Sequence, residues 1–162
     1  MWEYGGPEAL RVVGLPDPEP GPGEVLTARV ALDALAPRPG QIIAVTGTAG
    51  AFGGYAIQLA KADGLRVIAD AAPADERLVR TLGADEVVAR GDDVAERIRA
   101  LVPDGVPGLA DGAVLEERAL PAVADGGGLA TVRGWSGGAG IWVLYVGALV
   151  TVCGGTSLGR KS

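Results

Sequence analysis

The chain has 162 residues, of which 48% are hydrophobic, and this is the size of one domain with ample material for a core. Its formal charge of −6 disfavours general binding to nucleic acids or anionic membranes, because their phosphates would repel it, and favours a small-molecule partner. With no histidine and a single cysteine, Cys153, the chain can assemble neither a His/Cys zinc site nor a Ser-His-Asp or Cys-His catalytic centre. The lone cysteine, and an N-terminus without the basic and apolar regions of a signal peptide, favour a cytoplasmic location.

Two short β-type runs, residues 10–13 and 25–30, lie near the N-terminus on either side of a proline-rich stretch at 16–23. Prolines remove ladder donors and favour an extended or turning connection. Two strands are too few for an independent core, so a flexible or edge-docked segment is as compatible with this pattern as a packed hairpin. We predict a short N-terminal β arm over residues 1–30.

From residue 31 onward the pattern becomes regular. After a helical turn or two at 31–36, apolar strand-like runs alternate with helical patterns of about ten residues. Such alternation predicts βαβ units, and therefore an α/β fold in which helices cover a doubly wound parallel sheet. Because crossovers are right-handed, the carboxyl ends of these strands meet at one edge of the sheet, where a ligand would bind. The strands are expected at 42–45, 65–69, 86–89, 108–114 and 128–134, and the helices at 53–63, 74–82, 94–102 and 116–124.

The segment 141–152 is nearly uninterrupted apolar sequence. A membrane span needs about twenty such residues, so a buried strand or a short core segment is favoured. As an exposed edge, the same segment would instead drive formation of a homodimer. We expect the α/β domain to extend over residues 31–152 and a loose tail to follow at 153–162.

A glycine-rich turn connects the strand at 42–45 to the following helix. Gly47, Gly50 and Gly53 recur at every third residue, so the chain can turn tightly, approach a phosphate closely and pack the helix against the strand. Backbone N–H groups and a helix N-terminus would then point at the ligand. The second strand leads to Asp70, at about the distance where dinucleotide folds place a ribose-binding acid. The predicted cofactor-binding turn comprises Gly47, Thr48, Ala49, Gly50, Ala51, Phe52 and Gly53.

Four separated motifs carry a family resemblance. They are Pro-Gly-Gln at 39–41, Thr-Ala-Gly-Ala-Phe-Gly at 48–53, Gln-Leu-Ala-Lys at 58–61 and Leu-Gly-Ala-Asp at 82–85. Residues 39–134 resemble the Rossmann-like nucleotide-binding domain of the medium-chain dehydrogenase/reductase superfamily, in its zinc-independent, NADPH:quinone reductase-like branch. Residues 3–30 resemble the opening of the GroES-like catalytic domain of the same family, and the resemblance implies that most of that domain is missing between the two parts.

The resemblance implies an oxidoreductase that transfers hydride from a nicotinamide cofactor to a quinone, an enal or a similar acceptor. The cofactor carries this chemistry, so a chain without histidine could support it, and no catalytic residue is assigned. Because most of the substrate pocket is missing, a non-catalytic dinucleotide-binding remnant or a dimerising structural domain is an alternative. A methyltransferase with a glycine-rich first turn, in which Asp70 would hold a ribose, is a more distant one.

The choice of cofactor depends on the end of the second strand. Counting from the glycines selects Asp70, which would accept from the ribose 2′-hydroxyl and favour NAD. Aligned through the helix, the resemblance instead places Ala71 at the discriminating position, where a 2′-phosphate fits and Arg77 or Arg66 could supply the positive charge. We therefore predict NADP (NADPH) rather than NAD as the cofactor. The resemblance also places cofactor contacts at the ends of later strands, at Gly112, Ala113 and Thr131.

Overall fold

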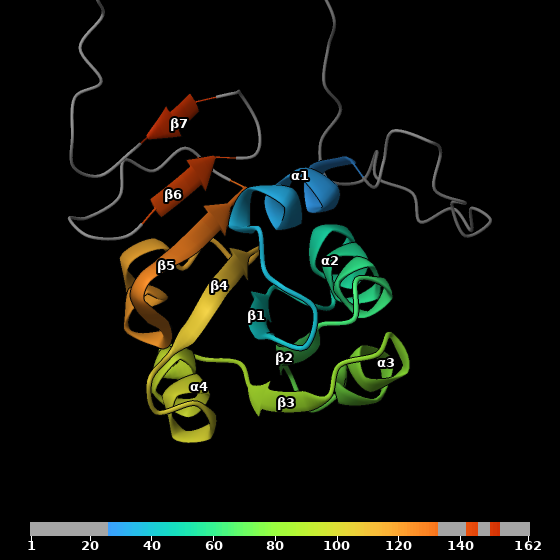
Figure 1. Cartoon of the computed structure of the whole chain (residues 1–162). Coiled ribbons are helices and arrows are strands. Elements are labelled where there is room, and N and C mark those ends of the chain that lie inside the picture. The colour runs from blue at the N-terminus through green and yellow to red at the C-terminus, as the bar shows by residue number, and fades with distance from the viewer. Residues whose placement is uncertain (1–25, 133–141, 146–149, 153–162) are drawn as a thin grey trace, which may run out of the picture.

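The described residues form a sheet with helices on both of its faces (Figure 1). The computed structural model describes residues 26–132, 142–145 and 150–152. Their strands pair in the order β3-β2-β1-β4-β5-β6-β7, and all pairs are parallel except the antiparallel pair of β6 and β7. The first six follow the strand order of the Rossmann fold, which confirms the predicted α/β fold with a doubly wound parallel sheet. The strands are β1 (Ile42–Thr46), β2 (Arg66–Ala71), β3 (Glu86–Ala89), β4 (Val106–Asp111), β5 (Val123–Thr131), β6 (Trp142–Tyr145) and β7 (Val150–Val152).

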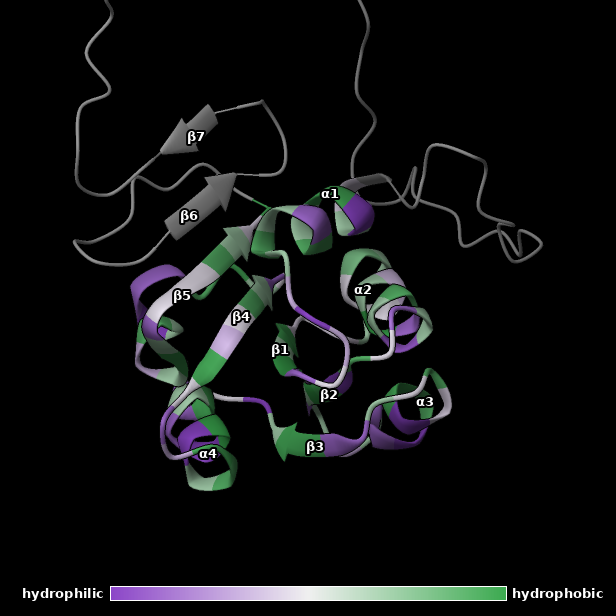
Figure 2. Cartoon of the chain, in the orientation of Figure 1, coloured by the Kyte–Doolittle hydropathy of each residue, from purple (hydrophilic) through white to green (hydrophobic). Residues whose placement is uncertain are grey.

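Two hydrophobic clusters, one on each face of the sheet, hold the helices in place. Successive side chains of a strand point to opposite faces, so Ile43 and Val45 of β1 join one cluster and Ala44 joins the other. The ribbons of α3 and α4 both carry stretches of hydrophilic residues (Figure 2). The first cluster includes residues of α1 (Leu26–Leu35), α2 (Ala51–Ala62) and α3 (Glu76–Thr81). The second includes residues of α4 (Val94–Leu101) and of the 3₁₀ helix η3 (Leu120–Ala122). A further 3₁₀ helix, η2 (Glu116–Arg118), precedes η3.

Helix α1 corrects the prediction of a strand at residues 25–30. The helix begins at Leu26, and its residues Ala28, Ala31 and Leu32 are completely or almost completely buried at helical spacing. The burial of this apolar stripe against α2 and the sheet outweighs the strand preference of Thr27 and Val30. The ten-residue helix therefore includes part of the segment that the sequence assigned to the N-terminal β arm.

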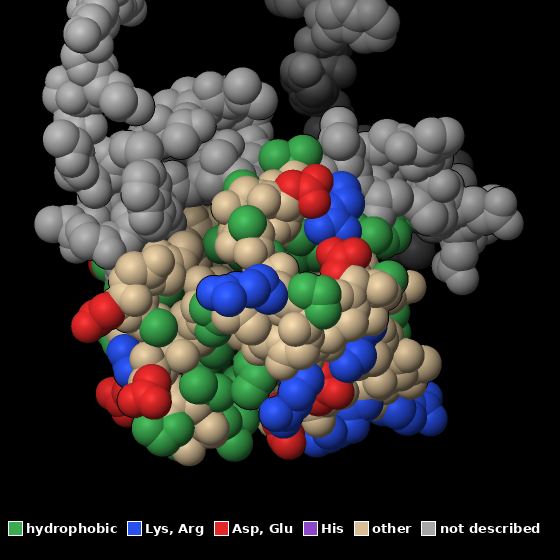
Figure 3. Space-filling model, in the orientation of Figure 1, with side chains coloured by type: hydrophobic (Ala, Val, Ile, Leu, Met, Phe, Trp, Pro, Cys, Tyr) green, Lys and Arg blue, Asp and Glu red, His purple; other side chains and the backbone are tan. Residues whose placement is uncertain are grey.

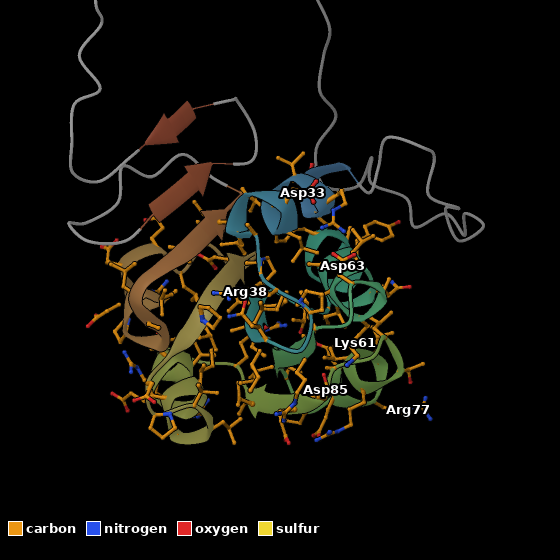
Figure 4. All side chains as sticks on the ribbon, in the orientation of Figure 1. Asp33, Arg38, Lys61, Asp63, Arg77 and Asp85 are labelled. Carbon is orange, nitrogen blue, oxygen red and sulfur yellow. The ribbon has the colours of Figure 1, made fainter. Side chains whose placement is uncertain are left out.

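An ion-pair cluster fastens the solvent side of α1 to the end of α2. The Arg29 guanidinium lies 2.7 Å from carboxylate oxygens of both Asp33 and Asp63. Asp33 and Asp63 face each other from the two helices in Figure 4. The hydrogen bond with Asp63 raises the pKa of Arg29 against the opposing effect of burial, so the guanidinium stays charged at all ordinary pH values.

The segment after β4 corrects a second prediction. Instead of one helix over 116–124, the chain makes the short 3₁₀ helices η2 and η3, and β5 then begins at Val123, earlier than the predicted 128. Pro121 lies in the first turn of η3, where its missing N–H leaves no helical acceptor unpaired, but it limits the helix to a short piece. The early start of β5 extends the central sheet.

The apolar run at 141–152 forms strands where it is described. β6 pairs with β5 over Trp142–Tyr145, and β7 pairs with β6 over Val150–Val152. The remaining N-terminal arm, residues 1–25, and the tail at 153–162 lie outside the described residues. In the part of the chain that the structure describes, no helix is both long and apolar enough to span a membrane.

Candidate functional site

The glycine-rich turn between β1 and α2 is packed too tightly for side chains at two of its glycines. Gly47 has a φ of +67°, and a Cβ atom on it would lie 2.6 Å from the carbonyl carbon of Gly112. A Cβ on Gly53 would lie 2.5 Å from the Gly47 carbonyl oxygen. A Cβ atom on Gly50 would lie 3.2 Å from the Gly47 carbonyl oxygen, so a side chain there would be crowded but could fit after a small shift. The turn thus requires glycine at positions 47 and 53, as its spacing predicts.

Helix α2 opens beside this turn without a side-chain cap. Its N-cap is Gly50, whose N–H donates to the Gly47 carbonyl at 3.0 Å, and no side chain of the described residues accepts from the first helical N–H groups. Ala49, Gly50 and Ala51 are exposed, whereas Thr48 and Gly53 are buried. The unpaired N–H groups and the positive end of the helix dipole make this exposed corner suited to an anion such as a pyrophosphate.

Asp70 fixes the turn from the side of β2. The residue is 2% exposed, and its Oδ1 accepts a hydrogen bond from the Thr48 N–H at 3.2 Å. The Thr48 hydroxyl donates to the Asp70 carbonyl oxygen. The second carboxylate oxygen, Oδ2, lies 3.3 Å from Nε of Arg90. Both oxygens of the predicted ribose-binding acid therefore have partners within the protein, and the carboxylate holds the turn in place.

The other residues predicted near the second strand separate in space. Ala71 is the last residue of β2, at the same edge as the turn, and is buried. Arg66 begins β2, and at about 3.3 Å per residue it lies roughly 16 Å from Ala71, at the opposite edge, so its proposed contact with a 2′-phosphate is wrong. Arg77 is exposed on α3 and points outward from the fold (Figure 4), with no ion pair to a described residue.

Arg90 is a residue of this edge that the sequence did not single out. It directly follows β3, and its backbone N–H donates to the Ala71 carbonyl at 2.9 Å. Its side chain is 43% exposed while its Nε contacts the buried Asp70 carboxylate. Its position in the sequence could have identified it, because a residue just after a parallel strand lies at the carboxyl edge of the sheet.

The loop after β4 forms the opposite wall of the site. Asp111 is fully buried, and its Oδ1 accepts from the Thr46 hydroxyl at 2.7 Å while its Oδ2 accepts from the Glu116 N–H at 3.0 Å. The Ala113 N–H donates in turn to Thr46 Oγ1 at 3.3 Å. A Cβ atom on Gly112 would lie 2.7 Å from the Phe52 ring. This contact brings the predicted Gly112 and Ala113 beside the turn at the β1/β4 boundary, where the strand order reverses and ligands bind in such sheets.

Thr131 completes the row of predicted residues at this edge. It is fully buried, ends β5, and pairs in register with Asp111 of β4 on one side and Tyr145 of β6 on the other. The structure therefore brings the turn, Ala71, Gly112, Ala113 and Thr131 to one edge of the sheet and leaves Arg77 on the outer side of α3.

An ion pair joins two of the sequence motifs below the site. Lys61 Nζ lies 2.9 and 2.8 Å from the two oxygens of Asp85 and also donates to the Leu65 carbonyl at 3.0 Å. Asp85 Oδ2 accepts from the Val67 N–H at 2.7 Å. Burial alone would raise the pKa of Asp85, but the hydrogen bonds from Lys61 and Val67 more than offset this and lower it. Figure 4 shows Lys61 and Asp85 pointing toward each other between α2 and the start of β3.

Comparison with known proteins identifies the family. The model of the family described as "Zinc-binding dehydrogenase" matches residues 51–150, more than half of the chain. The chain belongs to the zinc-binding dehydrogenase family. The matched residues include most of the Rossmann-like domain of this medium-chain superfamily, as the motifs predict.

Relatives of this dehydrogenase domain include both alcohol dehydrogenases and quinone oxidoreductases. Alcohol dehydrogenase 2 of Caenorhabditis elegans is 40% identical over 86 residues, which are 52% of this chain and 24% of that protein. The quinone oxidoreductase of Thermus thermophilus, also solved in complex with NADPH, is 39% identical with a TM-score of 0.59, covering 68% of this chain and 36% of that one. An NAD-dependent alcohol dehydrogenase is 35% identical with a TM-score of 0.61, covering 80% and 37%. The chain thus spans about a quarter of the curated relative, and the comparisons leave open the branch within the superfamily.

The donor set of this dehydrogenase chain does not fit a zinc ion. The whole sequence has no histidine and one cysteine, whereas protein zinc sites use three or four ligands, chiefly His and Cys. Among the described residues no group of three His, Cys, Asp or Glu side chains lies close enough to hold a metal.

Proposed function

We propose that this chain binds NADPH at the carboxyl edge of its sheet and serves hydride transfer to a quinone, an enal or a similar electron-poor acceptor. The observation that carries the proposal is the uncapped start of α2 beside a turn in which Gly47 and Gly53 leave no room for a Cβ atom. A backbone of this shape admits a pyrophosphate to direct contact with N–H groups. The bound nicotinamide would supply the hydride chemistry.

In this proposal each part of the edge has a separate task. The exposed N–H groups of residues 49–51 hold the pyrophosphate, and Phe52 and Gly53 pack the helix against the turn. Ala71 leaves space beside the adenosine ribose, because its side chain is too small to contact a 2′ substituent. The nicotinamide half of the cofactor would lie beside the ends of β4 and β5, near Gly112, Ala113 and Thr131. No described residue is assigned as an acid or a base.

We further propose that the reaction is independent of zinc and that the protein acts in the cytoplasm. Zinc independence is supported by the lack of histidine and the single cysteine. The acidic composition, with a net charge of −6, supports a small-molecule substrate rather than a nucleic acid or a membrane surface as the partner.

Paired calorimetric titrations of the full chain with NADPH and NADH test the binding step. We expect both cofactors to bind, NADPH the more tightly. Loss of NADPH absorbance in the presence of a panel of quinones and enals then tests turnover. If neither NADPH nor NADH binds, the whole proposal is overturned. Binding without turnover would overturn only its enzymatic part.

Binding without turnover is our second candidate function. It is favoured by the sequence itself, in which residue 30 runs almost directly into the segment before the first strand, where the resemblance places most of the catalytic domain. A dinucleotide-binding protein without its own substrate pocket would give the same titration curves as the enzyme and no acceptor-dependent oxidation.

A dimer through the segment 141–152 is a separate proposal. Among the described strands β7 ends the sheet on this side, and an open strand edge is a template for pairing with a second copy of the chain. Light scattering after gel filtration should give twice the monomer mass at high concentration. A monomer mass at every concentration would contradict the dimer.

A further inference from the structure

We propose that the ion pair between Asp92 and Arg118 controls how fast a dinucleotide enters and leaves the site at the carboxyl edge of the sheet. The pair joins the segment after β3 to the 3₁₀ helix η2 after β4, and we call it the Asp92–Arg118 clasp. This inference rests on the proposed binding of a dinucleotide and adds the step that limits its exchange.

The clasp joins two segments that the order of the strands sets apart. β2 and β1 lie between β3 and β4, so the ends of β3 and β4 are separated by three strand spacings, roughly 14 Å in all. Arg118 Nη1 nevertheless lies 2.6 Å from Asp92 Oδ1. Because Asp92 lies just before α4 and Arg118 just before η3, the clasp is on the side of the sheet that these helices cover, opposite α2. A dinucleotide at the carboxyl edge would therefore lie between the start of α2 and the clasp.

The span of the clasp distinguishes it from the local ion pairs of the surface. Acidic and basic side chains lie beside each other at several places on the face shown in Figure 3. The pair of Arg80 and Glu76, for example, joins two residues four positions apart in α3, and so supports a helix that is already formed. The clasp joins residues 26 positions apart in different segments, so its loss would let these segments separate.

The stretch before Arg118 has a strained backbone. Val114 and Glu116 have φ values of +58° and +56°, in the left-handed region that residues with side chains keep only where surrounding contacts hold them. One such contact is the hydrogen bond from the Glu116 N–H to buried Asp111, at 3.0 Å. Ala119, directly after η2, is completely buried. Residues 113–118 are thus held at both ends, and without the clasp the strained stretch between them can relax away from the edge.

The exposure of the clasp suits a contact that opens and closes. The side chain of Arg118 is 53% exposed and that of Asp92 is 90% exposed, and an ion pair in water is weak enough to break readily. The Asp92 side stays in place when it breaks, because Val94 at the start of α4 is 1% exposed in the core. Opening is therefore confined to residues 113–118.

Stopped-flow fluorescence of NADPH on the full chain tests the clasp. Arg118→Gln and Asp92→Asn should each raise both the association and the dissociation rate constant by about 2- to 5-fold, the range for an exposed ion pair. The dissociation constant should stay unchanged, because the clasp controls access without contacting the cofactor. The two variants change the net charge in opposite directions, so electrostatic steering cannot produce the same effect in both. Arg80→Gln, which removes the same charge as Arg118→Gln from a local pair, should leave both rate constants unchanged.

Two further measurements separate the ion pair from its individual side chains. The double variant Asp92→Arg/Arg118→Asp should restore the wild-type rate constants. In about 1 M sodium chloride, where the Debye length is about 3 Å, the difference between the wild type and Asp92→Asn should disappear. Unchanged rate constants in both single variants, or a double variant as fast as the single ones, would overturn the clasp. A faster dissociation alone, with an equal loss of affinity, would also overturn it, since that result means direct contact with NADPH.

Amide hydrogen exchange of the free chain distinguishes the clasp from the proposed function. Asp92→Asn should accelerate exchange of the N–H groups of residues 113–118 by about 2- to 5-fold and leave exchange in α2 unchanged. Equal exchange in this variant and the wild type would overturn the clasp even where NADPH binds. If neither NADPH nor NADH binds, the proposed function and the control of cofactor exchange fail together, whereas faster exchange at 113–118 would still show that the ion pair holds this stretch.

Discussion

Replacement of Gly53 by alanine is the most direct test of the glycine-rich turn. In a helix interior, exchange of glycine for alanine normally stabilises by about 1 kcal/mol. At Gly53, however, the new Cβ would lie 2.5 Å from the Gly47 carbonyl oxygen, 2.6 Å from the Thr48 Cα and 2.8 Å from the Gly47 carbonyl carbon. All three are backbone atoms, so relief requires displacement of the turn itself. Overpacking of this kind costs about 1–3 kcal/mol, which exceeds the gain in helix propensity.

The adjacent Gly54 provides a matched control. It is also buried in α2, but its Cβ would meet a flexible atom, Leu82 Cδ1, at 3.4 Å and the Thr48 carbonyl oxygen at 3.8 Å, which are ordinary contacts. We expect Gly54→Ala to be as stable as the wild type or up to about 1 kcal/mol more stable, and to bind NADPH normally. Gly53→Ala should lower the melting temperature by about 2–6 °C and weaken NADPH binding at least tenfold, because the N–H groups that we propose bind the pyrophosphate would move.

Urea unfolding, thermal unfolding and NADPH titration of both variants give the measurement. The reasoning is refuted if Gly53→Ala matches Gly54→Ala in both stability and affinity, since the contact distances would then have no consequence. Loss of affinity in both variants would show that the helix start tolerates no added volume at all, and that the difference between 2.5 and 3.4 Å does not decide the outcome.

Three further predictions concern the scaffold around the site. Because the folded pKa of Asp85 is lowered, its ion pair with Lys61 stabilises the protein above about pH 4, and this contribution is lost as pH falls further. The difference in unfolding free energy between the wild type and Asp85→Asn, measured by urea unfolding, should therefore shrink between pH 7 and pH 3. A difference that stays constant over this range would contradict the ion-pair role. Val114 has a φ of +58°, a conformation that costs a β-branched residue about 1–3 kcal/mol. Val114→Gly should therefore leave the unfolding free energy unchanged or raise it. Val87→Gly, in the regular strand β3, should lower it. Arg99 donates to the carbonyls of Pro121 and Pro103, each at 2.5 Å, and to that of Val123 at 3.3 Å. Arg99→Met should therefore lower the unfolding free energy by about 2 kcal/mol in thermal unfolding, whereas Arg80→Met, which removes only an exposed ion pair with Glu76, should lower it by less than about 0.5. Equal losses would show that the three hydrogen bonds of Arg99 to carbonyls do not stabilise the fold.

The sheet was predictable because parallel strands buried on both faces read as continuous apolar runs. The runs at 42–45 and 65–69 match β1 and β2 within two residues, since no polar face interrupts them. The predicted boundary between the β arm and the α/β domain, between residues 30 and 31, falls inside helix α1. That division separated Ala28 from Ala31 and Leu32, and so hid the apolar stripe that the helix buries.

The glycine positions of the site were predictable, but the partners of its buried acids were not. Glycine spacing states a local backbone requirement, and the structure shows that requirement at Gly47 and Gly53. The role of Asp70 depends on Thr48, 22 residues away, and on Arg90, 20 residues away. No local pattern specifies such contacts, and an arginine after a short strand is by itself an ordinary surface residue.

The two buried acids have a joint consequence for binding. Asp70 at the end of β2 and Asp111 at the end of β4 flank β1 on its two sides, because β1 pairs with both strands. Each accepts a hydrogen bond from the chain as it leaves β1, Asp111 from the Thr46 hydroxyl and Asp70 from the Thr48 N–H. The turn is therefore held from both sides by groups that a ligand does not need to contact. A site fixed in this way spends little binding free energy on ordering its own backbone, so more of the interaction with the phosphates appears as affinity.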